Sequence, residues 1–229
     1  MVRIIKEFIP GLPNALVVGA LRFFSLFSFI SKKKRSRNRD INIEELRTGN
    51  LTGKDGFIEN QHAMKDLMFG KTDMAYAGCE IIAVYNALLS LGFPKDLPEL
   101  ISTFEKKGSV LGGRFGTSPY ALYRYLSKVF DNVSFSFKRR DFEKLAQDSR
   151  VFIITYYNDA KDIMQQIHTV CVTKDKDEGM HPHNAYCRET GICSVERLEQ
   201  ALGVEGRGKI LFMTGIKQNE EKERKEENK

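Results

Sequence analysis

The 229-residue sequence contains no tryptophan, six prolines and only four cysteines. Four cysteines are too few for a disulfide scaffold, which excludes the small disulfide-rich secreted domains and favours a reducing compartment. Hydrophobic residues make up 41% of the chain and charged residues 29%, a balance that excludes a disordered protein. The length allows one globular domain of ordinary size with extensions.

The sequence also has little basic charge outside one short segment. Residues 32–39 contain six Lys or Arg residues and no acid, which equals the formal net charge of +6 of the whole chain. Residues 1–31 carry a net +2, so residues 40–229 sum to −2. Because the basic charge is confined to this segment, it indicates a segment that attaches the protein to another surface rather than a nucleic-acid-binding fold. We therefore expect no nucleic-acid partner.

An apolar segment precedes these basic residues. Residues 8–30 contain a single charged side chain, Arg22. A secretory signal is disfavoured because the basic residues follow the apolar run at once. Three interpretations remain: a membrane-spanning helix, an interfacial helix that binds an anionic membrane surface through residues 8–39, and a core helix of the domain itself. Either membrane interpretation places the main domain in the cytoplasm, attached to the inner face of the membrane, because the basic side faces inward.

Hydrophobic periodicity predicts mainly helices in the first half of the domain and mainly strands in the second. The expected helices cover residues 81–91, 98–107, 119–129, 139–146 and 194–202. The expected strands cover residues 133–137, 150–157, 167–173 and 209–215. This order is typical of an α+β protein in which a helical half packs against an antiparallel sheet.

The composition divides the chain into four parts. They are an apolar N-terminal segment (1–31), a basic and polar linker (32–56), the folded domain (57–216) and a charged tail (217–229). The linker is predicted because its basic residues give way to a polar, glycine-containing stretch, and the tail because nearly all its side chains are charged or amides.

One cysteine opens the most apolar helix. Gly78 and Cys79 come directly before the run from Ile81 to Leu91, and Gly78 allows the backbone to turn sharply there. At a helix N-terminus the unpaired N–H groups and the helix dipole favour an anion, so we expect Cys79 to lose its proton more easily than an ordinary thiol. The alternative is that Cys79 is simply a small buried residue.

A catalytic cysteine needs a histidine to accept its proton and a polar group to orient that histidine. Of the four histidines, His168 lies near the start of an apolar strand, where the ring is presented rigidly. Asn184 follows 16 residues later, after an expected hairpin around Gly179, so the return strand is expected to place its amide beside the imidazole.

Gly78-Cys79 opening a buried helix, His168 on a strand and Asn184 after the next turn resemble the papain-like cysteine peptidases. The similarity is greatest to the compact bacterial type found as leader-cleaving peptidase domains of bacteriocin exporters, and it covers roughly residues 61–217. The resemblance implies that Cys79 is the nucleophile, His168 the general base and then acid, and Asn184 the orienting group. It implies a peptide or protein substrate, hydrolysis of a peptide or isopeptide bond or a related acyl transfer, and no cofactor.

The chain departs from the family pattern at the oxyanion donor. Papain-like enzymes usually carry a glutamine a few residues before the cysteine, whereas the sixth residue before Cys79 is Asp73. A carboxylate there would repel the developing negative charge. Gln61 is a substitute if its loop folds back, and Gly78 and Asp73 are further candidates for contact with substrate.

Two other functions remain open. The first is a catalytically weak or inactive peptide-binding module on the same fold, which Asp73 at the donor position favours. The second is a zinc-stabilised interaction domain, whose candidate ligands are His181, His183, Cys187, Cys193 and Cys171. Their spacing matches no common zinc knuckle, so we assign no metal ligand.

Overall fold

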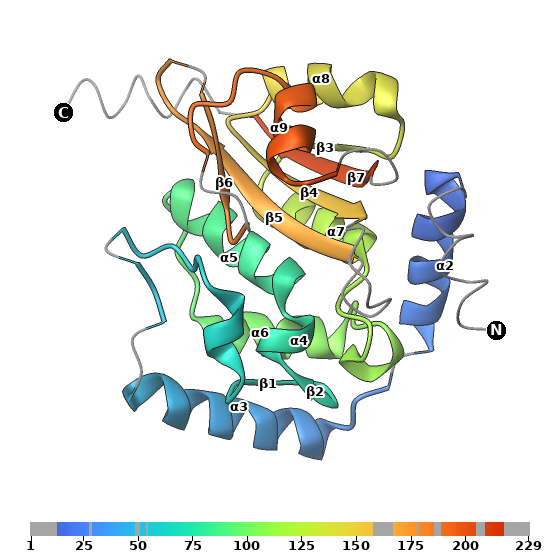
Figure 1. Ribbon diagram of the computed structural model, residues 1–229. Coiled ribbons are helices and arrows are strands. Elements are labelled where there is room, and N and C mark those ends of the chain that lie inside the picture. The colour runs from blue at the N-terminus through green and yellow to red at the C-terminus, as the bar shows by residue number, and fades with distance from the viewer. Residues whose placement is uncertain are drawn as a thin grey trace.

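The computed structural model describes residues 13–27, 29–48, 51–53, 55–157, 167–177, 179–185, 189–204 and 209–217. Its helices are α2 (Asn14–Leu26), α3 (Lys32–Thr48), α4 (Met74–Ala77), α5 (Cys79–Ser90), α6 (Leu97–Lys106), α7 (Pro119–Val129), α8 (Arg139–Gln147) and α9 (Val195–Ala201), with 3-10 turns η2 (Gln61–Met64) and η3 (Leu111–Gly113). Its strands are β1 (Met68–Phe69), β2 (Thr72–Asp73), β3 (Val133–Ser136), β4 (Val151–Tyr157), β5 (Ile167–Lys174), β6 (Met180–His183) and β7 (Lys209–Ile216). The α+β class predicted from the sequence is confirmed (Figure 1).

Five strands form one antiparallel sheet in the order β3-β7-β4-β5-β6. Side chains of the central strand β4 alternate between its two faces. Val151 and Ile153 pack in the core with α5 and α6, whereas Phe152 and Ile154 pack with α8 and α9. Figure 1 shows α5 on one side of the sheet and α8 and α9 on the other. Both faces are covered, which explains why β4 is buried along its whole length and mostly apolar rather than alternating.

Helix α5 is the most deeply buried helix among the described residues. Most of its side chains are shielded from solvent, and it packs against β5 and β4. Its one buried amide, Asn86, accepts a hydrogen bond from the N–H of Ile58 and donates one to the Ile58 carbonyl, both at 2.9 Å. With that amide satisfied, the helix can be surrounded by apolar side chains at little cost in unpaired polar groups.

Helix α2 is attached to the sheet side of the domain. Asn14 donates from its amide nitrogen to the carbonyls of Phe137 and Ile210, at 3.1 and 2.8 Å. Val17 and Val18 are buried. No described helix combines the length and the apolarity needed to cross a membrane. Residues 1–12 of the apolar segment lie outside the described residues.

Residues 32–48 are a helix, so the predicted linker over 32–56 is wrong for this part. Asn38 and Asn42, one turn apart on α3, point into the domain. Asn38 donates to the Gly70 carbonyl at 3.0 Å and to the carboxylate of Glu105, and Asn42 exchanges two hydrogen bonds with the backbone of Met68. The buried side chains of α3 are these two amides, and Leu46 is only partly buried against the core, which explains why no hydrophobic pattern revealed the helix. The predicted tail beyond residue 217 lies outside the described residues.

Candidate active site

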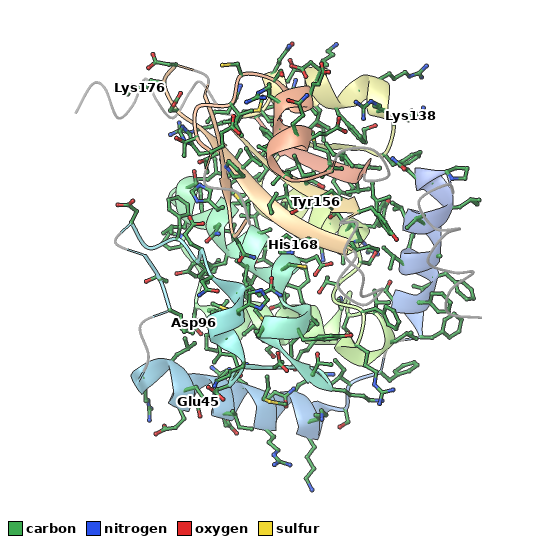
Figure 2. The ribbon with its side chains drawn as sticks, in the orientation of Figure 1. Glu45, Asp96, Lys138, Tyr156, His168 and Lys176 are labelled. Carbon is green, nitrogen blue, oxygen red and sulfur yellow. The ribbon has the colours of Figure 1, made fainter. Side chains whose placement is uncertain are left out.

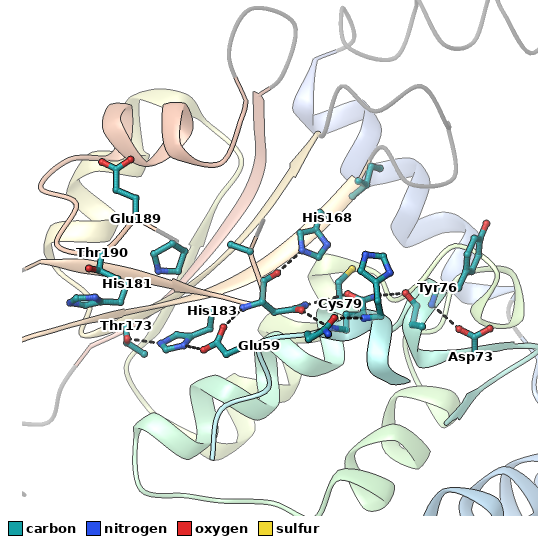
Figure 3. Close-up of a pocket in the computed structure, with 18 residues that line it drawn as sticks. Glu59, Asp73, Tyr76, Cys79, His168, Thr173, His181, His183, Glu189 and Thr190 are labelled. Atoms are coloured by element: carbon teal, nitrogen blue, oxygen red, sulfur yellow. Dashed lines mark hydrogen bonds and ion pairs between the residues drawn. The ribbon is translucent and has the colours of Figure 1, made fainter. Parts of the chain in front are cut away.

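One pocket of about 950 Å³ lies between the amino end of α5 and strands β5 and β6. It brings together the three residues predicted as a triad, Cys79, His168 and Asn184, although they are far apart in the sequence. Figure 3 shows Cys79 entering the pocket from α5 and His168 from β5, at neighbouring positions. Gln61 and Asp73 line the same pocket. The sequence therefore identified residues that share one cavity.

Cys79 is nearly covered, with 7% of its surface exposed. Its thiol donates a hydrogen bond to Oε2 of Glu80 at 3.2 Å. Burial raises the pKa of Cys79 well above that of an ordinary thiol, and the charge and hydrogen bond of Glu80 raise it further. The N–H of Thr169 opposes this only in part. The expectation of an acidified thiol is therefore wrong for this state, because burial and a neighbouring carboxylate outweigh the helix N-terminus.

Glu80 was missed in the sequence, although it directly follows Cys79. Its carboxyl group is buried, and burial raises its pKa to about 7. Backbone N–H groups of Glu80 and Thr117 and the Cys79 thiol offset this only partly. Gly116, at φ +65°, makes room for the group, since a Cβ there would lie 2.8 Å from Oε2. A carboxyl group with such a pKa can both accept and release a proton near neutral pH.

His168 lies on β5 near the middle of the molecule (Figure 2). It is buried, with 8% of its surface exposed. Its Nε2 lies 2.8 Å from the main-chain oxygen of Asn184. Because a carbonyl only accepts, Nε2 carries the hydrogen in the neutral ring and Nδ1 carries the lone pair. Burial lowers the pKa of His168 and the charge of His62 lowers it further, while the Asn184 bond opposes the shift. The ring is therefore neutral at neutral pH and can act as a base.

Asn184 holds His168 through its main-chain carbonyl, whereas the sequence predicted its side-chain amide. The amide instead bonds Gln61: Oδ1 accepts from the Gln61 N–H at 3.0 Å, and Nδ2 donates to the Gln61 side-chain oxygen at 3.2 Å. Asn184 has φ +58°, a left-handed conformation that asparagine adopts more readily than most residues. In this conformation, at the end of β6, the main-chain carbonyl of Asn184 faces the imidazole of His168.

The loop that carries Gln61 folds back into the site. Gln61 donates from Nε2 to the Ala75 carbonyl at 2.9 Å, and an amide nitrogen carries two hydrogens, so one is accounted for. Asp73, at the usual donor position, instead caps α4 by accepting the Tyr76 N–H at 2.8 Å.

Gly78 serves close packing rather than an unusual turn. Its φ of −98° is ordinary. A Cβ at Gly78 would lie 2.5 Å from the Met74 carbonyl oxygen, which is too close for any side chain. The reason predicted for this glycine is therefore wrong, but a larger residue would displace the start of α5.

The outer end of the pocket contains a second hydrogen-bonded group. His183 contacts Glu59 through Nδ1 at 2.5 Å and Thr173 through Nε2 at 2.9 Å. Glu59 also accepts the N–H of Asn184 at 2.8 Å. Burial alone would raise the pKa of Glu59, but the bonds from His183 and Asn184 outweigh it and hold the pKa below its ordinary value. Glu59 thus connects the outer end to the residue that holds His168 (Figure 3).

The described residues that were considered for zinc do not form a cluster. His183 is engaged as above, His181 contacts Asp175 at 2.8 Å, and Cys171 is buried against α5. Cys193 is exposed, and Cys187 lies outside the described residues. Within the part of the chain that the structure describes, no group of three or more His, Cys, Asp or Glu could hold a metal ion.

Comparison with known proteins adds no relative. No protein-family model, no curated protein and no solved structure matches the chain.

Proposed function

We propose that the chain is a papain-like cysteine peptidase, or a related acyl-transfer enzyme that acts on peptide or isopeptide bonds. The observation that carries the proposal is the shared pocket of Cys79 and His168, in which the Asn184 carbonyl leaves the lone pair of His168 on Nδ1. A helical half packed against an antiparallel sheet, with the site between them, supports the papain-like assignment. The pocket is large enough for a short peptide segment.

The reaction begins with a protonated thiol. At rest the thiol hydrogen is directed at Glu80, so the thiolate forms during the attack rather than before it. Sulfur bonds to the carbonyl carbon, and the proton passes to Nδ1 of His168. His168 then protonates the leaving nitrogen as the C–N bond breaks. Water then gives a proton to His168 as its oxygen bonds to the thioester carbon, and His168 returns the proton to sulfur as the C–S bond breaks, which restores the thiol.

Gln61, rather than Asp73, is the side chain that would stabilise the oxyanion. Its amide lies in the pocket and retains one hydrogen beyond the bond to Ala75. Asp73 is committed to the end of α4. Removing one donor of this kind lowers kcat by a factor of about 10²–10³ in acyl-transfer enzymes.

A peptidyl epoxide that alkylates catalytic cysteines tests the proposal. We expect labelling of Cys79 at pH 7.5, located by peptide mass spectrometry. The labelling rate should be about 100-fold lower in His168→Ala, because this variant lacks the base. His181→Ala is the matched control, because it removes a histidine that lines the same pocket but contacts Asp175. Its labelling rate should stay within about twofold of wild type.

Alkylation of Cys193 by iodoacetamide serves as an internal reference, because this thiol is exposed and does not line the pocket. Wild type should also cleave peptides in a proteome-derived mixture, and Cys79→Ser should not. Labelling of Cys79 that does not depend on His168 would contradict the proposal.

A peptide-binding module is the second candidate. The raised pKa of Cys79 favours it, since a protonated, nearly covered thiol is a poor nucleophile. Peptide binding that is unchanged in Cys79→Ser, together with no turnover by wild type, would select this function over hydrolysis.

A further inference from the structure

Exposed apolar side chains are concentrated at one corner of the molecule. Among the described residues, nine large hydrophobic side chains are exposed, and six of them belong to α2 and the residues directly after it. These six are Leu16, Phe23, Phe24, Leu26, Phe27 and Phe29. Phe29 is 83% exposed and Leu26 68%, which is unusual for side chains of this size.

The domain holds α2 so that this face stays outward. Beyond the contacts of Asn14, Val17 and Val18, the Arg22 guanidinium lies 4.4 Å from the centre of the Tyr120 ring on α7. A helix fixed along one side presents the opposite side continuously. The exposed phenylalanines are therefore a feature of the fold rather than of a free end.

The other three exposed hydrophobic side chains belong to segments that adjoin α2 and the start of α3. Phe115 and Tyr76 line a small cavity together with Leu21 of α2. Leu111 precedes Gly112, whose carbonyl accepts the N–H of Lys71 at 2.9 Å, and this turn lies against Gly70, which Asn38 of α3 also contacts. The apolar surface thus extends from α2 onto the loop at 111–116.

Basic side chains border this surface. Lys32, Lys33 and Arg37 are exposed on the first turns of α3, three residues after Phe29, and the first acid on the helix is Asp40. Arg114, in the apolar loop, is exposed as well. Figure 1 shows that the end of α2 and the start of α3 meet at one corner. We call the set Phe23, Phe27, Phe29, Lys32 and Lys33 the N-terminal corner.

We propose that the N-terminal corner binds the surface of an anionic lipid bilayer. Phenylalanines placed at the boundary between headgroups and acyl chains remove apolar area from water, and lysines beside them attract acidic headgroups. The proposal concerns contact with one surface of the bilayer, made by the described residues of α2 and α3. The charge pattern selects an anionic surface over a neutral one.

The full chain is tested with vesicles of phosphatidylcholine alone and with 30% phosphatidylserine. The chain contains no tryptophan, so Phe29→Trp supplies a single reporter. We expect co-sedimentation with the anionic vesicles, a blue shift of the reporter, and quenching by brominated lipid. Binding should fall at least tenfold between 50 and 500 mM NaCl, because the lysine contribution is screened.

Two double variants separate the contributions. Lys32→Glu with Lys33→Glu should lower vesicle affinity by at least tenfold, since each basic residue contributes about fivefold. Arg140→Glu with Lys144→Glu makes the same charge change on the exposed side of α8, at the opposite end of the molecule from α3, and should leave affinity within about twofold. Phe27→Ser with Phe29→Ser should weaken binding at both salt concentrations.

An equal loss of vesicle affinity in the α8 variant would overturn the proposal, because the attraction would then depend on the total charge of the protein rather than on the N-terminal corner. So would a reporter that stays at its aqueous wavelength, or binding to heparin without binding to anionic vesicles at the same salt concentration.

Discussion

Two glutamates contact residues of the site, and their pKa values are shifted in opposite directions. Glu80 is buried beside the Cys79 thiol, and its pKa rises to about 7. Glu59, at the outer end, is half-exposed and accepts hydrogen bonds from His183 and the Asn184 N–H, so its pKa falls below the ordinary value. The depth of burial, set against the hydrogen bonds and charge that each carboxylate meets, therefore decides which of the two glutamates holds its proton.

The opposite shifts give opposite effects of pH on stability. Glu80 binds its proton more tightly when folded, so the stability it contributes is complete below about pH 4.5 and is lost as pH rises through about 7. Glu59 binds its proton more weakly when folded, so its contribution is present above about pH 4.5 and is lost as pH falls below that.

Among the substitutions considered, Glu80→Gln should change the pH dependence of the unfolding free energy most. A shift from 4.5 to about 7 corresponds to a loss of at most about 3 kcal/mol of unfolding free energy between pH 4.5 and 8. Glutamine does not ionise, so the variant should lack this loss. Urea denaturation at pH 5, 6, 7 and 8 measures it.

The same variant should alkylate faster at Cys79 above pH 7, because the charge that raises the thiol pKa is gone. Glu59→Gln is the control, since it leaves the Cys79–Glu80 pair intact and should retain the loss of stability between pH 5 and 8. An unchanged pH profile in Glu80→Gln would mean that Glu80 is ionised at little cost.

Asn184 connects Glu59 to His168, and its substitution should have an intermediate effect on stability. Asn184→Ala loses both bonds to Gln61, which costs about 1 kcal/mol where pocket water can replace them. It also forces alanine to φ +58°, at about 1 kcal/mol more. Asn184→Gly avoids the second cost, so the alanine variant should be about 1 kcal/mol less stable. Equal stabilities would show that the left-handed conformation is not retained.

Glu59→Gln should give the smallest effect, about 1 kcal/mol at pH 7. Its carboxylate accepts two bonds, but half of the side chain is exposed, so solvent screens the pair with His183. The loss should become smaller as pH falls below about 4.5, because the wild-type carboxylate then begins to take up its proton. Thermal unfolding at pH 3, 5 and 7 checks this. A loss as large at pH 3 as at pH 7 would show that shape, rather than charge, holds the outer end.

The predicted elements of the domain match the structure closely wherever apolar periodicity is strong. The helix at 119–129 and the strands around Val151 and Ile167 fall where they were expected, because amphipathic or continuous apolar patterns are direct consequences of burial. Helix α3 was missed because it is held by Asn38 and Asn42, and polar contacts leave no periodic apolar signal.

The site was predicted at the level of residues but not of atoms. Order and spacing were enough to select Cys79, His168 and Asn184, which share the pocket. They did not reveal that Asn184 uses its carbonyl, since main-chain direction depends on a left-handed φ. Nor did they reveal the effect of Glu80, because adjacency in sequence does not state how deeply a carboxyl group is buried.

The attachment of α3 fixes where this domain can be cut. Glu105 is buried and receives Asn38 and the Gly70 N–H on one carboxylate oxygen, while burial raises its pKa. A fragment that starts at residue 40 would lack Asn38 and leave this carboxylate and the Gly70 carbonyl without that donor. Expression trials should therefore keep α3 from its first residue, and trials that start upstream of Asn14 also keep the bonds of α2 to Phe137 and Ile210.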